Sequence, residues 1–207
     1  MEFKEGFNSG QKNTYNETNF GPNSQYIDKV GSILHEPTVL YGMGSTRMDA
    51  YFQSLIEEIQ KNVKAEIIDE LLYYTTQKDG TLGMEQKLID GGFRQDRIME
   101  ALKQKEFYAK KAMRFDSYPS AQRIFLLLFA RIKNEFNTSI FPLIEKQQPL
   151  NVVMEALRHK IVNPIMAMLE AGGAHDQYLN FTEDHIYGMI YYLTGMCHLN
   201  WKDYDNV

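Results

Sequence analysis

The chain has 207 residues, of which 43% are hydrophobic and 24% are charged, and its net charge is −5. This composition is typical of a soluble globular protein and excludes disordered and collagen-like chains. A membrane-spanning chain is excluded because the longest apolar run, residues 124–130, is far shorter than a bilayer span. The acidic balance excludes binding of polyanions over the whole surface, and the single cysteine favours a protein of the reducing cytoplasm.

Residues 1–44 differ in composition from the rest of the chain. They contain six of the fourteen glycines and five asparagines, and the first thirty residues have only Ile27 and Val30 as branched aliphatic side chains. Such a segment cannot bury enough apolar surface to form a core. We expect an extended Gly/Asn-rich arm with a short edge strand over residues 13–20, which either docks on the body or a partner or is a mobile tail.

Residues 45–207 carry apolar side chains at helical spacing and predict one all-α interaction domain of six to seven helices. Thr81 and Thr182 are the expected N-caps of two of them. Pro142 and Pro149 are expected to break the chain, and Pro164 to kink or split the helix around it. The predicted helices cover residues 48–74, 81–90, 94–115, 119–140, 151–170 and 182–201.

The last predicted helix has no charged residue between His185 and Lys202. At 100° per residue one face is aliphatic, and the opposite face carries small residues and tyrosines that would let another backbone approach closely. Neither face is typical of a helix exposed to water, so this helix is either the buried centre of its own bundle or half of an interface. The candidate interaction residues are Tyr187, Gly188, Tyr191, Tyr192, Gly195, His198 and Trp201.

No catalytic, cofactor-binding or metal site emerges from the motifs, and we expect none. Cys197 and His198 resemble half of a thiol dyad, but adjacent helical residues point about 100° apart, which favours a packing role for the cysteine. The five histidines have no paired spacing of the kind that binds zinc. An enzyme built around Cys197, His198 and His185 is one alternative.

The basic residues from Arg97 to Arg114 give a second alternative, a helical protein that binds nucleic acid through this face. Asp96, Glu100 and Glu106 are interleaved with them, and the chain is acidic overall. A solvated face is therefore the favoured interpretation, and we expect nucleic acid to bind only weakly or indirectly.

Several blocks of sequence resemble the C-terminal helical domain of bacterial ABC-three-component conflict systems. The resemblance covers roughly residues 48–204. The segment 188–201 resembles the closing motif of that domain and is the most specific of these blocks. The other blocks are residues 87–89, 101–111, 119–124 and 140–144.

The resemblance implies a function as well as a fold. In such systems, which overlap with Lamassu-type antiphage defence, this domain follows an effector such as a nuclease and couples it to an ABC or SMC-like ATPase and a small middle component. It implies a non-enzymatic coupling subunit whose partners are these proteins. A second copy of the chain is a further possible partner, which the two faces of the last predicted helix leave open. Residues 1–44 are too few and too polar to form an effector domain, so we expect the chain to recruit, assemble or restrain another component.

Overall fold

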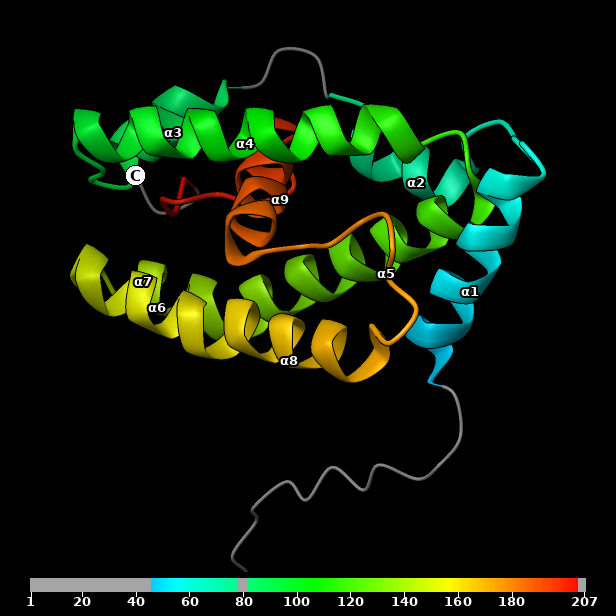
Figure 1. The fold of residues 1–207 in the computed structure, drawn as a ribbon. Coiled ribbons are helices and arrows are strands. Elements are labelled where there is room, and N and C mark those ends of the chain that lie inside the picture. Colours follow the sequence, from blue (N-terminus) through cyan, green and yellow to red (C-terminus); the bar gives the residue numbers. More distant parts are fainter. Residues whose placement is uncertain (1–45, 78–81, 205–207) are drawn as a thin grey trace, which may run out of the picture. The chain divides into compact units, whose positions relative to one another are not determined.

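The computed structural model describes residues 46–77 and 82–204, and in these ranges the chain is helical and has no strand (Figure 1). Two π-helical turns, η1 and η2, join their neighbours without a gap, so the described residues form seven continuous helices. The prediction of an all-α fold with six to seven helices is confirmed, whereas the expected arm, residues 1–44, lies outside the described residues. The elements are α1 (Arg47–Gln60), α2 (Asp69–Thr75), α3 (Met84–Asp90), α4 (Gln95–Phe115), α5 (Pro119–Glu135), η1 (Phe136–Ile140), α6 (Phe141–Glu145), α7 (Leu150–Leu157), η2 (Arg158–Val162), α8 (Asn163–Gly172) and α9 (Glu183–Gly195).

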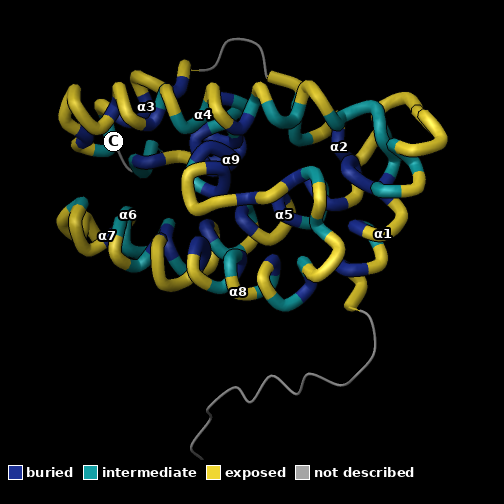
Figure 2. Tube along the Cα trace, in the orientation of Figure 1, coloured by how far each residue is buried: buried dark blue, intermediate teal, exposed yellow. Residues whose placement is uncertain are grey.

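The last helix, α9, lies inside the described domain. It contacts α3, α4, α5 and η2, and Figure 1 shows it between α4 and α5. Most of its residues are buried, as the dark tube of Figure 2 shows. The prediction of a buried last helix is therefore confirmed. A connected set of buried apolar side chains from all the longer helices packs around it.

The start of α9 follows the prediction from Thr182. This residue is extended, with φ −118° and ψ 170°, and its backbone N–H donates to Nδ1 of His185 over 3.1 Å. The arrangement is a capping box in which histidine takes the place usually held by Glu or Gln. Glu183 and Asp184 occupy the first turn, where their negative charge favours the positive end of the helix dipole.

The predicted end of this helix at Trp201 is wrong, because α9 ends at Gly195. Cys197 adopts a left-handed conformation with φ 64°, and the N–H of His198 donates to the Leu193 carbonyl over 2.9 Å. This is the hydrogen bond of a Schellman motif, which closes a helix and reverses the chain. The residues after it therefore fold back beside α9 and do not continue its faces.

Three other helices end in the same way. Asn62 closes α1 with φ 51°, Gly92 closes α3 with φ 80°, and Gln147 closes α6 with φ 51°. In each case the next N–H bonds back to a carbonyl five residues earlier, at distances of 2.8 to 3.0 Å. The prediction of one helix over residues 48–74 is wrong for this reason, since the chain turns at Asn62.

An extended segment, residues 63–68, separates α1 from α2. The buried amide of Gln122 holds it, accepting from the Ile68 N–H over 3.1 Å and donating to the Glu66 carbonyl over 3.0 Å. Val63 and Ile67 fit the apolar spacing of a helix, yet their exposed fractions are 46% and 38%. The helical stripe in the sequence therefore extends past the true end of α1.

The two π turns each come just before a proline. η1 precedes Pro142 and η2 precedes Pro164, and both prolines lie in the first turn of the following helix. Proline lacks an N–H and cannot donate to the carbonyl four residues earlier, so a wider turn lets the helix continue past it. The predicted break at Pro142 is wrong and the one at Pro149 is confirmed, because Pro149 is the N-cap of α7.

The beginning of α3 also differs from the prediction. The structure places the N-cap at Gly83, one residue before Met84, whereas the expected cap, Thr81, lies outside the described residues. The predicted stop at Gly91 and Gly92 is confirmed, with Gly91 as C-cap. The turn that follows brings α4 antiparallel to α3 and forms one wall of the site described next (Figure 1).

Candidate partner-binding groove

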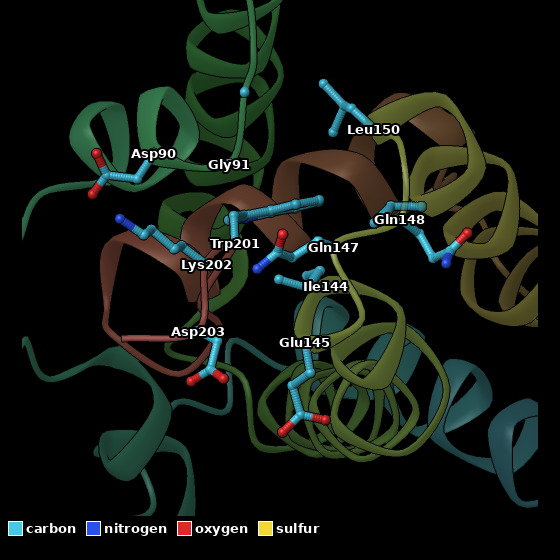
Figure 3. A pocket seen from close by; sticks show the side chains of 12 residues that line it. Asp90, Gly91, Ile144, Glu145, Gln147, Gln148, Leu150, Trp201, Lys202 and Asp203 are labelled. Atoms are coloured by element: carbon cyan, nitrogen blue, oxygen red, sulfur yellow. The ribbon is translucent and has the colours of Figure 1, made fainter. Parts of the chain in front are cut away.

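Two adjoining cavities open at the end of the domain where α3 turns into α4 and α6 turns into α7. Their volumes are about 410 and 660 Å³, and Gly92 and Leu150 line both of them. The smaller cavity is lined by the end of α3, the α6–α7 turn and the segment that follows α9 (Figure 3). The larger lies between the first turns of α4 and the α7–η2 helix, with α9 beneath. We call the pair the aromatic groove.

Aromatic side chains form the floor of the aromatic groove. The rings of Tyr187 and Tyr191 stack with centroids 6.5 Å apart, and the Tyr191 ring lies 6.3 Å from that of Trp201 at an angle of 27°. Phe93 meets the other side of Trp201 edge to face at 4.9 Å. Tyr187 is half-buried, whereas Tyr191 and Trp201 are 4% and 3% exposed. Three of the candidate interaction residues therefore form one continuous surface.

Two contacts and one neighbouring hydrogen bond hold Trp201 in this floor. Its indole Nε1–H donates to Oγ1 of Thr194 over 3.0 Å, and this threonine is buried at the end of α9. Gly91 lets the Trp201 backbone pass close by, since a β-carbon at residue 91 would lie 2.6 Å from Cβ of Trp201. The Tyr204 hydroxyl donates to Asp90 over 2.9 Å, which ties the end of the described chain to α3.

The hydroxyls of the two groove tyrosines and of Tyr204 remain protonated at neutral pH. Burial raises the pKa of Tyr191 and that of Tyr187, and the nearby Arg97 guanidinium offsets only a part of this shift. Burial and the hydrogen bond to Asp90 likewise raise the pKa of Tyr204 to about 12. All three hydroxyls are therefore neutral groups that can donate and accept hydrogen bonds.

The remaining candidates on α9 pack inside the domain. A β-carbon at Gly188 would lie 2.2 Å from the Gln104 carbonyl oxygen, so α4 and α9 meet there backbone to backbone. The Tyr192 ring stacks on that of Phe129 at 5.8 Å and 4°, and Gly195 lies against the Lys105 side chain. At Gly188 and Gly195 the small-residue face therefore packs against α4.

Cys197, His198 and His185 do not form one site. The Cys197 thiol lies 3.8 Å from the Gly195 carbonyl oxygen and 3.9 Å from that of Leu82. His198 packs between the rings of Tyr73 and Tyr74 at 4.9 and 5.2 Å. His185 lies in the first turn of α9, more than two helical turns from Cys197.

The basic residues of α4 do not all share one face. Lys105 reaches the end of α9, and Lys111 donates to the carbonyl oxygens of Leu179 and Asn180 in the α8–α9 loop. Lys110 forms an ion pair with Glu106 over 2.7 Å. Arg97, in the first turn, lines the aromatic groove instead. The structure therefore distributes these cations over different surroundings.

The sequence did not indicate the walls of the aromatic groove. Arg158 lies at the junction of α7 and η2 and approaches Glu183 of α9, with 3.7 Å between Nη2 and Oε2. Leu150 and Met154 of α7 face the tyrosines across the larger cavity. The two turns that meet here are more than fifty residues apart in the chain, and no local motif joins them.

Within residues 46–77 and 82–204, no three His, Cys, Asp or Glu side chains are grouped so as to hold a metal ion. No helix in these two stretches is long and apolar enough to cross a bilayer.

Comparison with known proteins gives a family. Searches of curated proteins and of solved structures find no match. The family model for C-terminal domain 9 of the ABC-three-component (ABC-3C) systems matches residues 83–201, which is more than half of the chain and runs from the N-cap of α3 to Trp201. The matched region contains α4, α9 and most of the residues that line the aromatic groove. The chain therefore belongs to the C-terminal domain 9 family of the ABC-three-component systems.

Proposed function

We propose that this chain is a non-enzymatic coupling subunit of a bacterial ABC-three-component system and that it binds another protein of that system through the aromatic groove. The observation that carries the proposal is the row Tyr187–Tyr191–Trp201 on the floor of the groove. Tyrosine contributes strongly to protein interfaces because it buries a large area and loses few rotatable bonds. Tyr187 is the half-exposed member of the row, and the buried rings of Tyr191 and Trp201 support it from below. A cavity of this kind at one end of a rigid helical body suits a partner element that inserts between the walls.

The proposed partners are an ABC or SMC-like ATPase, the middle component or an effector, and the proposed role is antiphage defence in the cytoplasm. Membership in a family of ABC-three-component domains supports protein partners of this kind. A second copy of the chain is the other partner that the buried last helix suggested. Coupling requires a stable surface, and the hydrogen bond and close backbone packing around Trp201 supply one.

Two observations favour a non-enzymatic role. The Cys197 thiol lies 3.9 and 3.8 Å from the backbone carbonyl oxygens of Leu82 and Gly195. The His185 ring packs against those of Phe107 and Phe181, with centroids 4.2 and 5.8 Å away. Both contacts are those of packed side chains. We therefore expect Cys197→Ser to keep any activity measured in the assembled system.

The test is co-purification. The chain carries an affinity tag and is expressed with candidate ATPase and middle components of its system, and size-exclusion chromatography with light scattering measures the complex. Tyr187→Ala should weaken binding about tenfold or more, because this half-buried ring can be removed without opening the core. Met113→Ala is the control, since this side chain is 70% exposed and lies on α4 away from the groove.

Three results would contradict the proposal. If no complex forms with any component, the coupling role is wrong. If Tyr187→Ala and Met113→Ala bind alike, the groove is not the binding site. Light scattering of the chain alone tests the remaining possibility, because a stable dimer that Tyr187→Ala dissociates would identify a second copy as the occupant of the groove. In cells that carry the whole system, Tyr187→Ala should reduce protection against phage in plaque assays.

A further inference from the structure

The charged residues of the aromatic groove separate by sign. Arg94, Arg97 and Arg158 line the larger cavity, opposed by Glu100 and Glu183. Asp90, Glu145 and Asp203 line the smaller cavity, where the single cation, Lys202, is directed toward Asp90 in Figure 3. One end of the groove is therefore net basic and the other net acidic, with the aromatic floor between them.

Arg97 is the cation that remains available at the basic end. Arg94 pairs with Asp96 over 2.7 Å, and Arg158 lies 3.7 Å from Glu183. The exposed guanidinium of Arg97 forms no ion pair or hydrogen bond with any residue that the structure describes. It lies in the first turn of α4, near the positive end of the helix dipole, where a cation is unfavourable. Stability of α4 therefore does not explain an arginine at this position.

Glu145 is in the opposite situation at the acidic end. Its exposed carboxylate has no hydrogen bond or ion pair with another residue of the described ranges. It is the last residue of α6, where the negative end of the helix dipole opposes an anion. At each end of the groove the partial charge of the helix end has the same sign as the side chain. This strengthens the positive potential at Arg97 and the negative potential at Glu145.

These charges determine which occupants fit. A nucleic acid backbone is uniformly negative and would be repelled by Glu145 and Asp203. A single ion or a small anion would leave the aromatic floor between the two ends uncovered. A peptide segment with an acidic side chain at one end, an apolar side chain in the middle and a basic side chain at the other end matches all three parts of the groove.

We propose that the aromatic groove binds one peptide segment of another ABC-three-component protein, with a carboxylate on Arg97, an apolar side chain over Tyr187 and Tyr191, and a cation on Glu145. The inference rests on the proposed coupling function and adds the chemistry and the direction of the bound segment. Opposite charges at the two ends allow one orientation and oppose the reverse one.

The experiment uses synthetic peptides as probes. Short overlapping peptides that tile the ATPase and middle components are labelled, and fluorescence anisotropy measures their binding to the full chain. We expect the binding peptides to carry an acidic and a basic residue on either side of an apolar one. Arg97→Glu and Glu145→Lys should each weaken such a peptide about tenfold. A peptide with its acidic and basic residues exchanged should bind the double variant better than it binds the unaltered chain.

Matched controls separate this effect from a general change of charge. Arg114→Glu makes the same change at the other end of α4, and Glu170→Lys makes it near the end of α8; neither residue lines the groove. Both controls should bind the peptides normally, and circular dichroism should show that all four variants remain folded and helical. If intact components bind the chain while Arg97→Glu and Glu145→Lys behave like the controls, the charge-oriented segment is wrong and the coupling function stands. If no intact component binds, the coupling function itself is wrong.

Discussion

Gly188 of α9 lies against Gln104 of α4 so closely that a β-carbon on the glycine would be 2.2 Å from the Gln104 carbonyl oxygen. Neither group can move aside, because both belong to the backbones of long helices. Gly188→Ala should therefore lower the free energy of unfolding by about 3 kcal/mol, even though alanine favours a helix. Thermal or urea denaturation measures this effect.

Gly195→Ala is the matched control for that substitution. A β-carbon there would lie 3.2 Å from Nζ of Lys105, the mobile end of a long side chain. We expect a change within about 0.5 kcal/mol. If both substitutions lower the free energy of unfolding equally, the close contact of α4 and α9 at Gly188 is not the cause of the loss.

Cys197 occupies the left-handed position of a Schellman motif, where glycine is the favoured residue. Cys197→Gly should therefore raise the free energy of unfolding by about 1 kcal/mol, since it removes the strain of a β-carbon at φ 64°. Cys197→Ala keeps the β-carbon and isolates the contribution of the thiol. Chemical denaturation of the three proteins separates the two contributions.

The reverse change at the end of α3 checks the same reasoning. Gly92 has φ 80°, and a β-carbon there would meet no atom within 4 Å, so Gly92→Ala changes only the backbone preference. We expect a loss of about 1 kcal/mol. A loss at Gly92 without a gain at Cys197 would mean that the thiol packing compensates for the backbone strain.

His185 makes the stability of the domain depend on pH. Burial lowers its pKa to about 4, and the site of protonation is Nδ1, the atom that accepts the Thr182 N–H. Between roughly pH 6.5 and 4 the unfolded chain binds a proton that the folded chain does not, so stability falls as the pH falls through this range. The loss is absent above this range and complete below it.

His185→Gln tests this pH dependence. Glutamine can still accept the Thr182 N–H in the capping box but does not titrate. Stability curves of the two proteins measured by denaturation should converge toward neutral pH, with the variant losing less stability on acidification. Parallel curves through the whole range would show that His185 is not the responsible group.

The single tryptophan of the chain gives a direct signal from the floor of the aromatic groove. Gly91→Ala should displace Trp201, because the new β-carbon would lie 2.6 Å from Cβ of the tryptophan. We expect red-shifted fluorescence emission with little change in helix content by circular dichroism. Gly83→Ala is the control, since nothing lies within 4 Å of its β-carbon. An unchanged emission in Gly91→Ala would show that the segment after α9 is not seated as described.

Local signals predicted some elements well. The helix over residues 94–115 corresponds to α4, Pro119 opens α5 and Thr182 caps α9. Strong apolar periodicity or a cap residue at a helix start carries this information in the sequence itself.

Helix ends were harder to predict. Of the four Schellman closures that the described residues contain, only Gly92 uses glycine. Asn62 is a weaker stop signal, and Gln147 and Cys197 are not residues that indicate a helix end. The sequence also placed Tyr187, Tyr191 and Trp201 among the candidates without showing that they face a cavity. The walls of the aromatic groove come from turns far apart in the chain, and only tertiary packing brings these turns together.

Because residues 136–140 form the π turn η1, the number of residues in this segment determines how the following helix is rotated. A π turn holds one residue more than an α-helical turn, so the helix after it is rotated by about 100°. Asn137 and Thr138 are exposed and should accept most replacements. Deleting either one would return the helix to an unbroken α-helical phase and rotate Ile144 and Glu145 away from the cavity that they line. Related chains that keep this wall of the groove are therefore expected to vary here by substitution and not by loss of a residue.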